Sequence, residues 1–386
     1  MNTLSKYISG DRAIWLVVVM LGIASLLLVY SSIVTLAFRY HQGNTIYYLV
    51  RHGGFVITGL IIIYLIHNIK YTYFSRIAQL ALWMSVPLLI ITLLLGTNIN
   101  DASRWLRIPV INQSFQTSDF AKLALVMYVA RMLSHKQDDI KNFKKTFIPI
   151  VLPVIIICGL IFPANLSTAA VLFISCIVLM FIGRVSVKHI LALIGTGIVL
   201  IALVLLVANS FPKIFPRTST WVNRIENFRD PENTGNYQVE QSKIAIATGG
   251  LYGKGPGNSN QRNFLPHPYS DFIYSIVIEE YGLIGGFFII VLYLILLYRS
   301  VRIVIKCKRT FGSLLVAGLA FSLVFQAIIN MAVASDLMPV TGQPLPMVSM
   351  GGTSIWFTSI AIGIILSVSR SIEADKRVKL KTNEEL

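Results

Sequence analysis

Apolar residues in this chain are grouped in long, nearly uninterrupted blocks, not in the narrow stripes that mark the buried face of a soluble helix. The blocks are about 17–25 residues long, the length that a helix needs to cross the hydrocarbon core of a bilayer. The pattern therefore predicts an all-α integral membrane protein with ten transmembrane helices. We place these helices at residues 13–36, 46–68, 77–96, 118–134, 147–163, 167–183, 188–209, 272–299, 311–335 and 352–370.

Charges between the blocks predict the orientation. Lys and Arg gather in the turns on the side of the N-terminus, whereas the opposite short loops hold only Arg39, Arg104 and Arg107. Positive charge in short loops marks the cytoplasmic side of a membrane protein. With an even number of crossings, we expect both termini in the cytoplasm, including a short charged tail over residues 371–386. The first block is too long for a signal peptide, so we expect it to be retained as a helix.

The composition supports a membrane protein and disfavours other classes. The 386 residues are 55% hydrophobic and 13% charged, with a mean hydropathy of +0.70, whereas soluble domains carry about 25% charged residues. The net charge of +16 does not indicate nucleic-acid binding, because the basic residues are concentrated where topology selection places them. Cys158, Cys176 and Cys307 show no spacing typical of a metal site or a disulfide framework.

One long polar segment, residues 210–271, lies between the seventh and eighth predicted helices and is expected to face outward. Loops of this length are usually functional or disordered. Aromatic and aliphatic residues at helical spacing, in WVNRIENFRD and YQVEQSKIAIATGGLYG, favour order and predict amphipathic or re-entrant pieces on the membrane face. The glycine-rich part is not a P-loop, because Thr248 stands where the first Gly is required and Gly255 follows Lys254. We expect residues 1–386 to form a single polytopic membrane domain.

Asp271 is the main candidate for chemistry. It lies at the boundary between the polar segment and the eighth predicted helix, where an ionisable residue is a functional candidate. Ser270 is a plausible N-cap, which would place Asp271 in the first helical turn. The helix dipole there favours the anion and the apolar setting favours the neutral acid, so the carboxyl group could act as a base near neutral pH. From position alone, a capping Asp without chemistry is about equally plausible.

Other charged residues lie inside or next to the apolar blocks. Asp119 and Lys122 have the i,i+3 spacing of an intrahelical ion pair, which within a membrane usually serves a cavity or a conformational change. Glu279 and Glu280 are adjacent on the eighth predicted helix and point about 100° apart, so we expect them to face different partners. Arg104, in the outward DASRWLRIP loop, suggests an anionic ligand.

The segment LMPVTGQPLPMVSMGGTS, residues 337–354, is an apolar run interrupted by Pro and Gly before the last predicted helix. Irregular backbone at membrane depth is tolerated only where it lines a cavity or is buried in protein. We therefore expect this segment to form the opposite wall of the outward site.

Several motifs resemble the SEDS family of membrane glycan polymerases, typified by FtsW and RodA. The last three of them are highly specific, and together they span essentially the whole chain in the family's order. The motifs are ASRWL at 102–106, DFAKLAL at 119–125, YQVEQSKIAIATGGLYGKGPGN at 237–258, LPHPYSDFIYSIVIEEYGLIG at 265–285 and TGQPLPMVSMGGTS at 341–354.

The resemblance implies a fold and an activity. The family has ten transmembrane helices, a large extracytoplasmic loop between helices 7 and 8, and cytoplasmic termini in the bacterial inner membrane. It polymerises lipid II, the undecaprenyl-pyrophosphate-linked disaccharide-pentapeptide, into peptidoglycan. The family's essential Asp corresponds to Asp271, which would be the general base of an inverting glycosyl transfer. The expected ligands of substrate and its pyrophosphate are Arg104, Lys122, Lys243, Gln241 and Ser349.

The resemblance also implies a metal cofactor and protein partners. A divalent cation, Mg²⁺ or Mn²⁺, would be held jointly with the pyrophosphate, because the sequence shows no compact cluster of metal ligands. The implied protein partners are a class B penicillin-binding transpeptidase, packed on the eighth and ninth helices, and regulators of the divisome or elongasome. The SMGGTS ending and the basic turn after the fourth helix are more similar to the division-type FtsW of Bacteroidetes-like bacteria than to RodA.

Three positions depart from the family pattern. Asp119 stands where Glu is more common, residues 162–165 read FPAN where a QPD-like turn is usual, and Ser167 replaces a Gly. Two other functions stay open: a lipid II flippase and a non-catalytic scaffold for the transpeptidase. The outward position of Asp271, Arg104 and Lys243 favours the polymerase, because a flippase needs a polar path to the cytoplasmic leaflet.

Overall fold

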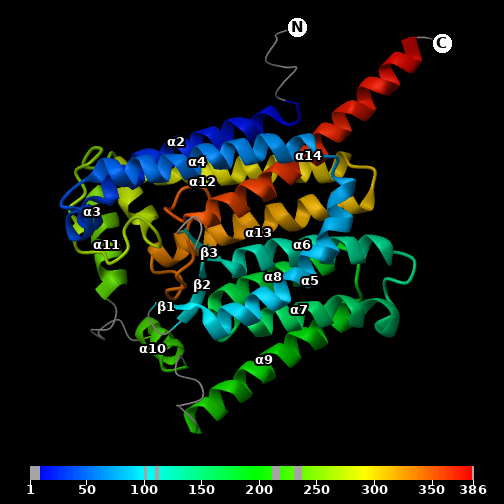
Figure 1. Cartoon of the computed structure of the whole chain (residues 1–386), viewed down its shortest axis with the longest axis horizontal. Coiled ribbons are helices and arrows are strands. Elements are labelled where there is room, and N and C mark those ends of the chain that lie inside the picture. Colours follow the sequence, from blue (N-terminus) through cyan, green and yellow to red (C-terminus); the bar gives the residue numbers. More distant parts are fainter. Residues whose placement is uncertain (1–8, 100–101, 109–112, 211–217, 230–236, 385–386) are drawn as a thin grey trace. The chain divides into compact units, whose positions relative to one another are not determined.

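The computed structural model describes residues 9–99, 102–108, 113–210, 218–229 and 237–384. The described chain is mostly helical, with one small sheet (Figure 1). It divides into two compact units. The first comprises Met1–Phe74, Gln238–Leu337 and Gly342–Leu386, and the second comprises Ser75–Tyr237 and Met338–Thr341. Whether the two form the predicted single domain stays a prediction.

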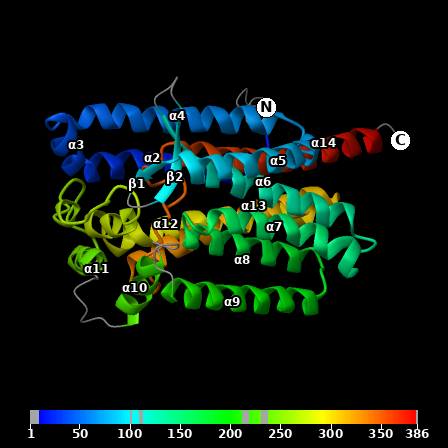
Figure 2. The same cartoon turned by 60° about the horizontal axis from the view of Figure 1, so that its bottom comes forward.

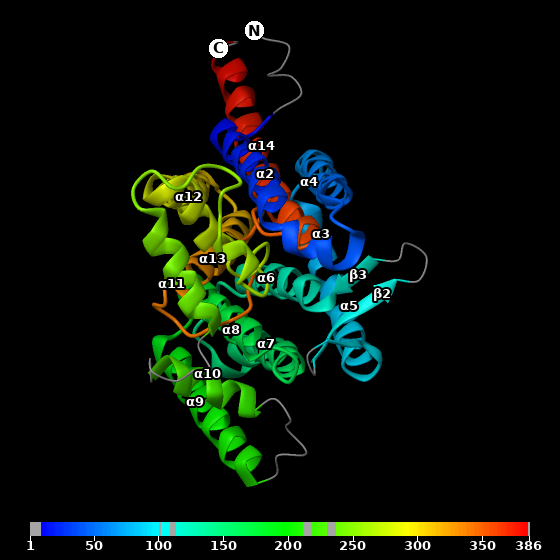
Figure 3. The same ribbon diagram turned by 90° about the vertical axis from the view of Figure 1, so that its left-hand side faces the viewer.

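The first unit is built on long apolar helices. Its elements are α2 (Arg12–Ser32), α3 (Val34–His41), α4 (Thr45–Asn68), α11 (Tyr237–Gly249), η3 (Gln261–Asn263), α12 (Ile273–Lys306), α13 (Thr310–Ala334) and α14 (Thr353–Glu384). Helix α14 packs on α4, and α12 packs on α2 and α13 (Figure 3). Small residues permit the closest contact: a Cβ at Gly59 would lie 2.7 Å from Ser359 Oγ, and one at Gly363 would lie 2.8 Å from Ile66 Cβ. Such small-residue contacts are typical of helix pairs in membranes.

Helix α12 is interrupted at Gly282, whose φ of 70° and ψ of −174° are not helical. A Cβ at this position would lie 2.1 Å from the carbonyl oxygen of Leu251, so only glycine fits between α12 and the glycine-rich segment after α11. The break leaves carbonyl groups of α12 available to that segment. Lys254 N–H donates to Glu279 O at 2.9 Å, and Gly255 N–H donates to Glu280 O at 3.0 Å.

The second unit combines a small sheet with a helical group. Its elements are α5 (Thr72–Leu95) from residue 75 on, β1 (Thr97–Ile99), β2 (Ala102–Ile108), β3 (Gln113–Gln116), α6 (Thr117–His135), η1 (Phe143–Phe147), α7 (Ile148–Ile161), α8 (Leu166–Ile182), α9 (Val187–Ser210) and α10 (Thr218–Arg229). The strands are antiparallel in the order β1-β2-β3, with Trp105 opposite both Thr97 and Gln116. Helices α6, α7 and α8 pack on one another (Figure 2).

Nine of the ten predicted helix ranges each coincide with one helix of the structure, and the first, residues 13–36, covers α2 and the start of α3. Among the described residues, seven helices are long and apolar enough to cross a membrane, by length and composition. They are Arg12–Ser32, Thr45–Asn68, Thr72–Leu95, Phe143–Ile161, Ile273–Lys306, Thr310–Ala334 and Thr353–Lys376. Leu166–Ile182 and Val187–Leu200 are apolar but shorter. A membrane protein of mainly helical fold is therefore confirmed, while the count of ten crossings stays a prediction.

The long polar segment, residues 210–271, contains helices, as expected, while its outward position stays a prediction. Helix α10 lies in it, and α11 buries one face through Val239, Ser242, Ala245 and Gly249. The sheet over residues 97–116 was not predicted. Its strands are short, and the alternation that would reveal them is weak in a segment with several polar residues.

Candidate functional site

Asp271 lies in a turn that precedes α12, and its side chain is half-buried. The expectation that Ser270 caps this helix was wrong. The helix begins at Ile273, and its N-cap residue is Phe272, which makes no side-chain capping bond. Instead, Ser270 Oγ donates to Asp271 Oδ1 at 2.9 Å. The turn from His267 to Ser270, closed by a backbone hydrogen bond of 3.1 Å, delays the start of the helix.

The main chain at Asp271 is held from α13. Asn330 Nδ2 donates to Asp271 O and to Gln343 O, at 2.8 Å in both cases. The side-chain amide of Asn330 therefore holds the main chain at Asp271 and at Gln343 to the same position on α13. A Cβ at Gly342 would lie 3.6 Å from Asp271 Oδ2, so this glycine leaves the face of the carboxylate uncovered.

The segment from Gly342 to Met350 lies beside the Asp271 turn, and that residues 337–354 form the opposite wall of an outward site stays a prediction. Met350 N–H donates to Tyr269 O at 2.9 Å, and Ser349 Oγ donates to Ser270 O at 2.6 Å. Ser349 Oγ also accepts from Leu345 N–H at 2.8 Å, and the side chain is 2% exposed. The hydroxyl of Ser349 therefore positions the Asp271 turn, and its expected contact with substrate stays a prediction.

Lys243 and Gln241 lie on α11, in the same unit as Asp271. Lys243 Nζ is 3.0 Å from Asp336 Oδ2, and both side chains are partly exposed. The intervening residue anchors the helix, because Ser242 Oγ is hydrogen bonded to Ser275 Oγ at 2.7 Å and donates to Ala334 O at 2.6 Å. This anchoring fixes α11, and with it a lysine, against the first turn of α12.

The other expected ligands belong to the second unit. Lys122 Nζ is 2.8 Å from Asp119 Oδ1, so the predicted ion pair is formed, and both side chains are largely buried. Arg104, on β2, donates from Nε to Ala164 O at 2.9 Å, which joins the sheet to the turn between α7 and α8. That turn retains a helix cap despite its departure from the family pattern, because Asn165 Oδ1 accepts from Thr168 N–H at 3.1 Å. Joint action of these cations with Asp271 stays a prediction.

Glu279 and Glu280 face different partners, as predicted. Glu279 is completely buried and accepts hydrogen bonds from the loop after α11. The donors are Lys254 Nζ at 2.7 Å, Ser259 Oγ, Asn260 N–H at 3.1 Å and Gln261 N–H at 3.3 Å. Glu280 is also buried and accepts from Ser31 Oγ on α2. The first carboxylate holds the loop, and the second joins α12 to α2.

No group of three or more His, Cys, Asp or Glu side chains in the described part of the chain could hold a metal ion. The described residues therefore do not form a metal centre by themselves. A divalent cation held mainly by pyrophosphate oxygens stays a prediction, and no step proposed below depends on it.

The sequence did not identify Asn330 and Gln343 as groups that hold the Asp271 turn, and it gave Ser270 the role of a helix cap instead of a donor to the carboxylate. Asn330 offered a signal, because it is a polar residue within the apolar block that became α13. Buried polar side chains are almost always hydrogen bonded, so a partner was to be expected. Only the fold shows that the partner is the main chain of Asp271.

Comparison with known proteins identifies the class. The family model described as "Cell cycle protein", FTSW_RODA_SPOVE, matches residues 11–374, so the chain belongs to the FtsW/RodA/SpoVE family. It is 34% identical over 372 residues to the probable peptidoglycan glycosyltransferase FtsW of Trichlorobacter lovleyi, covering 94% of each chain. It is 33% identical over 380 residues to the stage V sporulation protein E of Bacillus subtilis, covering 95% of this chain and 98% of the relative.

Solved structures support the same fold. One, from a study of polymerization and crosslinking by a peptidoglycan synthase complex, has a TM-score of 0.71 and 24% identity, covering 94% of this chain and 98% of the other. The rod shape determining protein RodA of Thermus thermophilus has a TM-score of 0.67 and 23% identity, covering 95% and 98%. At these identities, the likeness establishes the architecture and leaves the chemistry to the site.

Proposed function

We propose that this protein is a peptidoglycan glycosyltransferase that polymerises lipid II at the outer face of the bacterial cytoplasmic membrane. Three things support the proposal: the family, the names of relatives that cover nearly the whole chain, and the surroundings of Asp271. The observation that carries it is the half-buried carboxylate of Asp271. It is bound by a single hydroxyl at Oδ1, and Oδ2 accepts no hydrogen bond from the described residues. An acceptor-only group with free capacity can take a proton.

In the proposed reaction, the carboxylate of Asp271 accepts the proton of the acceptor sugar's 4-hydroxyl group. The oxygen of that hydroxyl attacks the anomeric carbon of the donor strand and forms the new glycosidic bond. The bond from that carbon to the pyrophosphate breaks, with inversion, and undecaprenyl pyrophosphate leaves with the electron pair. Charge grows on the leaving group, so cations placed against it stabilise the transition state. Lys243, Lys122 and Arg104 are proposed for this role.

The fixed main chain suits this chemistry. A general base must lie within hydrogen-bond reach of the proton it removes, and small displacements are costly. Asn330 and Ser349 hold the backbone on both sides of the Asp271 carboxylate. The carboxylate is therefore positioned through its backbone, while its oxygens remain available to substrate.

We further propose a protein partner, a cellular process and an orientation in the membrane. A class B penicillin-binding transpeptidase would pack its single helix on α12 and α13, where Leu283, Phe287 and Ile328 are exposed apolar side chains. The protein would act during septal cell-wall synthesis, with both of its termini in the cytoplasm. Copurification with the transpeptidase, and labelling of cysteines introduced at each terminus in intact cells, test these points.

The experiment for the catalytic role compares Asp271→Asn with Glu240→Gln in the purified, full-length protein. The first change keeps the size of the side chain and removes the base, and the second removes an exposed carboxylate on α11. We expect Asp271→Asn to lower the rate of lipid II polymerisation by about 10²–10⁴-fold. Glu240→Gln should polymerise at the rate of the unaltered protein, and both variants should unfold at its temperature.

Polymerisation by Asp271→Asn at an unaltered rate would overturn the role of Asp271. If the unaltered protein together with its transpeptidase makes no glycan but moves labelled lipid II across vesicle membranes, the function is that of a flippase. If it does neither, and the transpeptidase works only in its presence, the function is that of a scaffold.

A further inference from the structure

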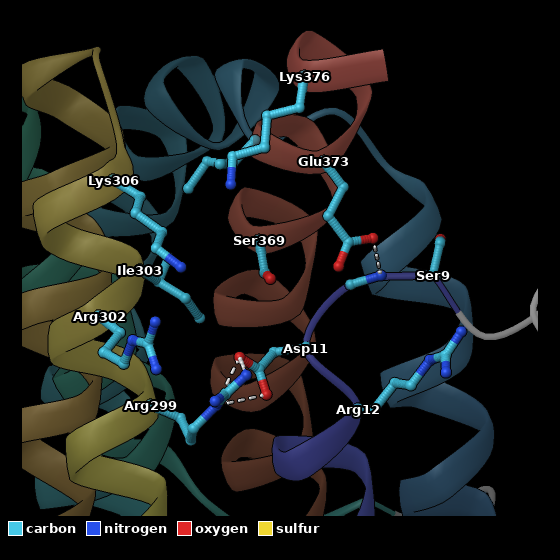
Figure 4. Close-up of a pocket in the computed structure, with 12 residues that line it drawn as sticks. Ser9, Asp11, Arg12, Arg299, Arg302, Ile303, Lys306, Ser369, Glu373 and Lys376 are labelled. Carbon is cyan, nitrogen blue, oxygen red and sulfur yellow. Dashed lines mark hydrogen bonds and ion pairs between the residues drawn. The ribbon is translucent and has the colours of Figure 1, made fainter. Parts of the chain in front are cut away.

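A cavity lies in the first unit, where α2 begins, α12 ends and α14 leaves its apolar part. Its volume is about 450 Å³. Five basic and two acidic side chains line it, together with two serines (Figure 4). None of these residues belongs to the site around Asp271, and the proposed reaction does not use them.

The two acids of the cavity are already engaged. Asp11 accepts from Arg299 Nε at 2.8 Å and 2.9 Å through its two oxygens, and it also caps α2 by accepting from Ala13 N–H. Glu373 accepts from Gly10 N–H at 3.1 Å. These bonds fix the wall of the cavity on the side of α2. Asp11 neutralises Arg299, and Glu373 forms no ion pair with a described residue.

Three cations face the cavity without an acidic partner. Arg302 and Lys306 on α12, and Lys376 on α14, point toward the space between the two helices, whereas Arg12 points away from it (Figure 4). None of the three forms an ion pair with a described residue. Ser369, which is 6% exposed, adds a hydroxyl donor at the floor of the same space. A concave site of this kind favours an anion with several oxygen acceptors.

The surroundings indicate that this anion is carried by a lipid. Tyr298, Val301 and Ile305 lie on the same stretch of α12 as Arg302 and Lys306, and they are exposed by 59%, 46% and 77%. A basic site bordered by exposed apolar side chains at the end of membrane-spanning helices suits a charged headgroup with its acyl chains alongside. Basic pockets between transmembrane helices on the cytoplasmic side are known to bind anionic headgroups. A soluble phosphate compound would make no use of the apolar border.

We propose that the cavity lined by Arg302, Lys306, Lys376 and Ser369 is a binding site for the phosphate group of an anionic phospholipid. By the orientation inferred from the sequence, the lipid belongs to the cytoplasmic leaflet. The bound headgroup joins the end of α12 to α14, whereas the neighbouring Asp11–Arg299 ion pair joins α12 to the start of α2. The site is separate from the Asp271 turn, so the lipid acts as a structural ligand and not as a substrate.

The test measures binding of headgroup-labelled phosphatidylglycerol to the purified full-length protein in neutral detergent micelles. The pocket variant is Arg302→Gln/Lys306→Gln/Lys376→Gln. The matched control is Lys141→Gln/Lys144→Gln/Lys145→Gln, which removes the same charge from exposed positions between α6 and α7. We expect the pocket variant to bind at least about tenfold more weakly, because each removed cation contributes to attraction of an anionic headgroup. The control should bind within about twofold of the unaltered protein, since these lysines do not line the cavity and exposed charges are screened by salt.

Competition distinguishes the sources of the phosphate group. We expect unlabelled phosphatidylglycerol to displace the label, and phosphatidylcholine and glycerol 3-phosphate to fail at the same concentration. Displacement by glycerol 3-phosphate at that concentration would overturn the lipid assignment. Equal binding by the pocket variant and the control would overturn the site itself. If the pocket variant does not fold, Lys306→Glu alone is measured against Lys144→Glu under the same two criteria.

Discussion

Asp271 and Glu279 belong to the same segment of the chain, yet the structure gives their carboxylates opposite surroundings. Glu279 is 0% exposed and accepts from a lysine, a serine and two backbone N–H groups. Asp271 is half-buried and accepts from one serine. Both are acidic residues near the start of one apolar helix, and the sequence does not show which carboxylate has its acceptor positions filled.

The difference shows how a membrane protein uses a costly charge in two ways. A buried carboxylate whose acceptor positions are filled holds structure, and removing it leaves its donors unpaired. A carboxylate that is fixed through its backbone, with free acceptor capacity, is available to a ligand. The loop held by Glu279 is continuous with the turn that carries Asp271, so the first residue supports the second.

The largest effect on stability is expected where the loop meets the break in α12. Gly253 has a φ of +80°, and a Cβ there would lie 2.2 Å from Glu280 O. Gly253→Ala should lower the free energy of unfolding by about 3 kcal/mol or more, from strain and a backbone clash. The control is Gly250→Ala, which has a φ of +57° but open space around the Cβ. Thermal unfolding in detergent should show a much smaller loss for the control, and equal losses would contradict the close packing.

The next largest effect on stability is expected for the Glu279 carboxylate, which accepts the hydrogen bonds of the loop. Glu279→Gln should cost about 2–3 kcal/mol, because the amide cannot accept from all the donors and leaves Lys254 without its charge partner. Glu280→Gln is the comparison, and it should cost less, because the hydrogen bond from Ser31 is retained. Chemical unfolding measures the difference, and protease cleavage within residues 250–261 should be faster only in Glu279→Gln. A Glu279→Gln protein as stable as Glu280→Gln would remove the distinction between the two acids.

A smaller effect is expected from the support of the Asp271 turn. Ser349→Ala removes the hydrogen bonds to Ser270 O and from Leu345 N–H, at a cost of about 1–2 kcal/mol. Polymerisation should slow by roughly tenfold, because the base is less well positioned. Ser354→Ala, whose hydroxyl makes no hydrogen bond with a described residue, should leave both the rate and the stability unaltered. An unaltered rate for Ser349→Ala at reduced stability would limit Ser349 to a structural role.

The smallest effect on stability is expected at the ion pair between Lys243 and Asp336. Both side chains are partly exposed, so a double-mutant cycle to Ala should give a coupling of about 1 kcal/mol or less. Lys243→Ala alone should raise the KM for lipid II if the lysine binds pyrophosphate. Asp336→Ala, which frees the lysine, should not raise it. A raised KM in both variants would indicate that the pair acts by holding α11.

The sequence by itself determined the membrane-spanning character and the positions of the helices, because the length of an apolar block is a local property. It also indicated Asp271 and the Asp119–Lys122 pair, because charges in apolar surroundings are rare and spacing on a helix is fixed. It did not reveal the sheet over residues 97–116 or the true start of α12. Those depend on pairing between strands of seven residues or fewer and on the turn from His267 to Ser270, where local signals are weak.

Only the tertiary structure decided that the acceptor positions of Glu279 are filled and that Asp271 keeps free acceptor capacity. The donors to Glu279 come from residues 254–261, and the groups that hold Asp271 come from α13 and from residues 342–350. The basic cavity likewise joins residues 9–12, 299–306 and 369–376. Nothing in the local sequence brings such distant segments together. Their meeting is fixed by the packing of α2, α12, α13 and α14, because buried polar groups must find their partners wherever that packing places them.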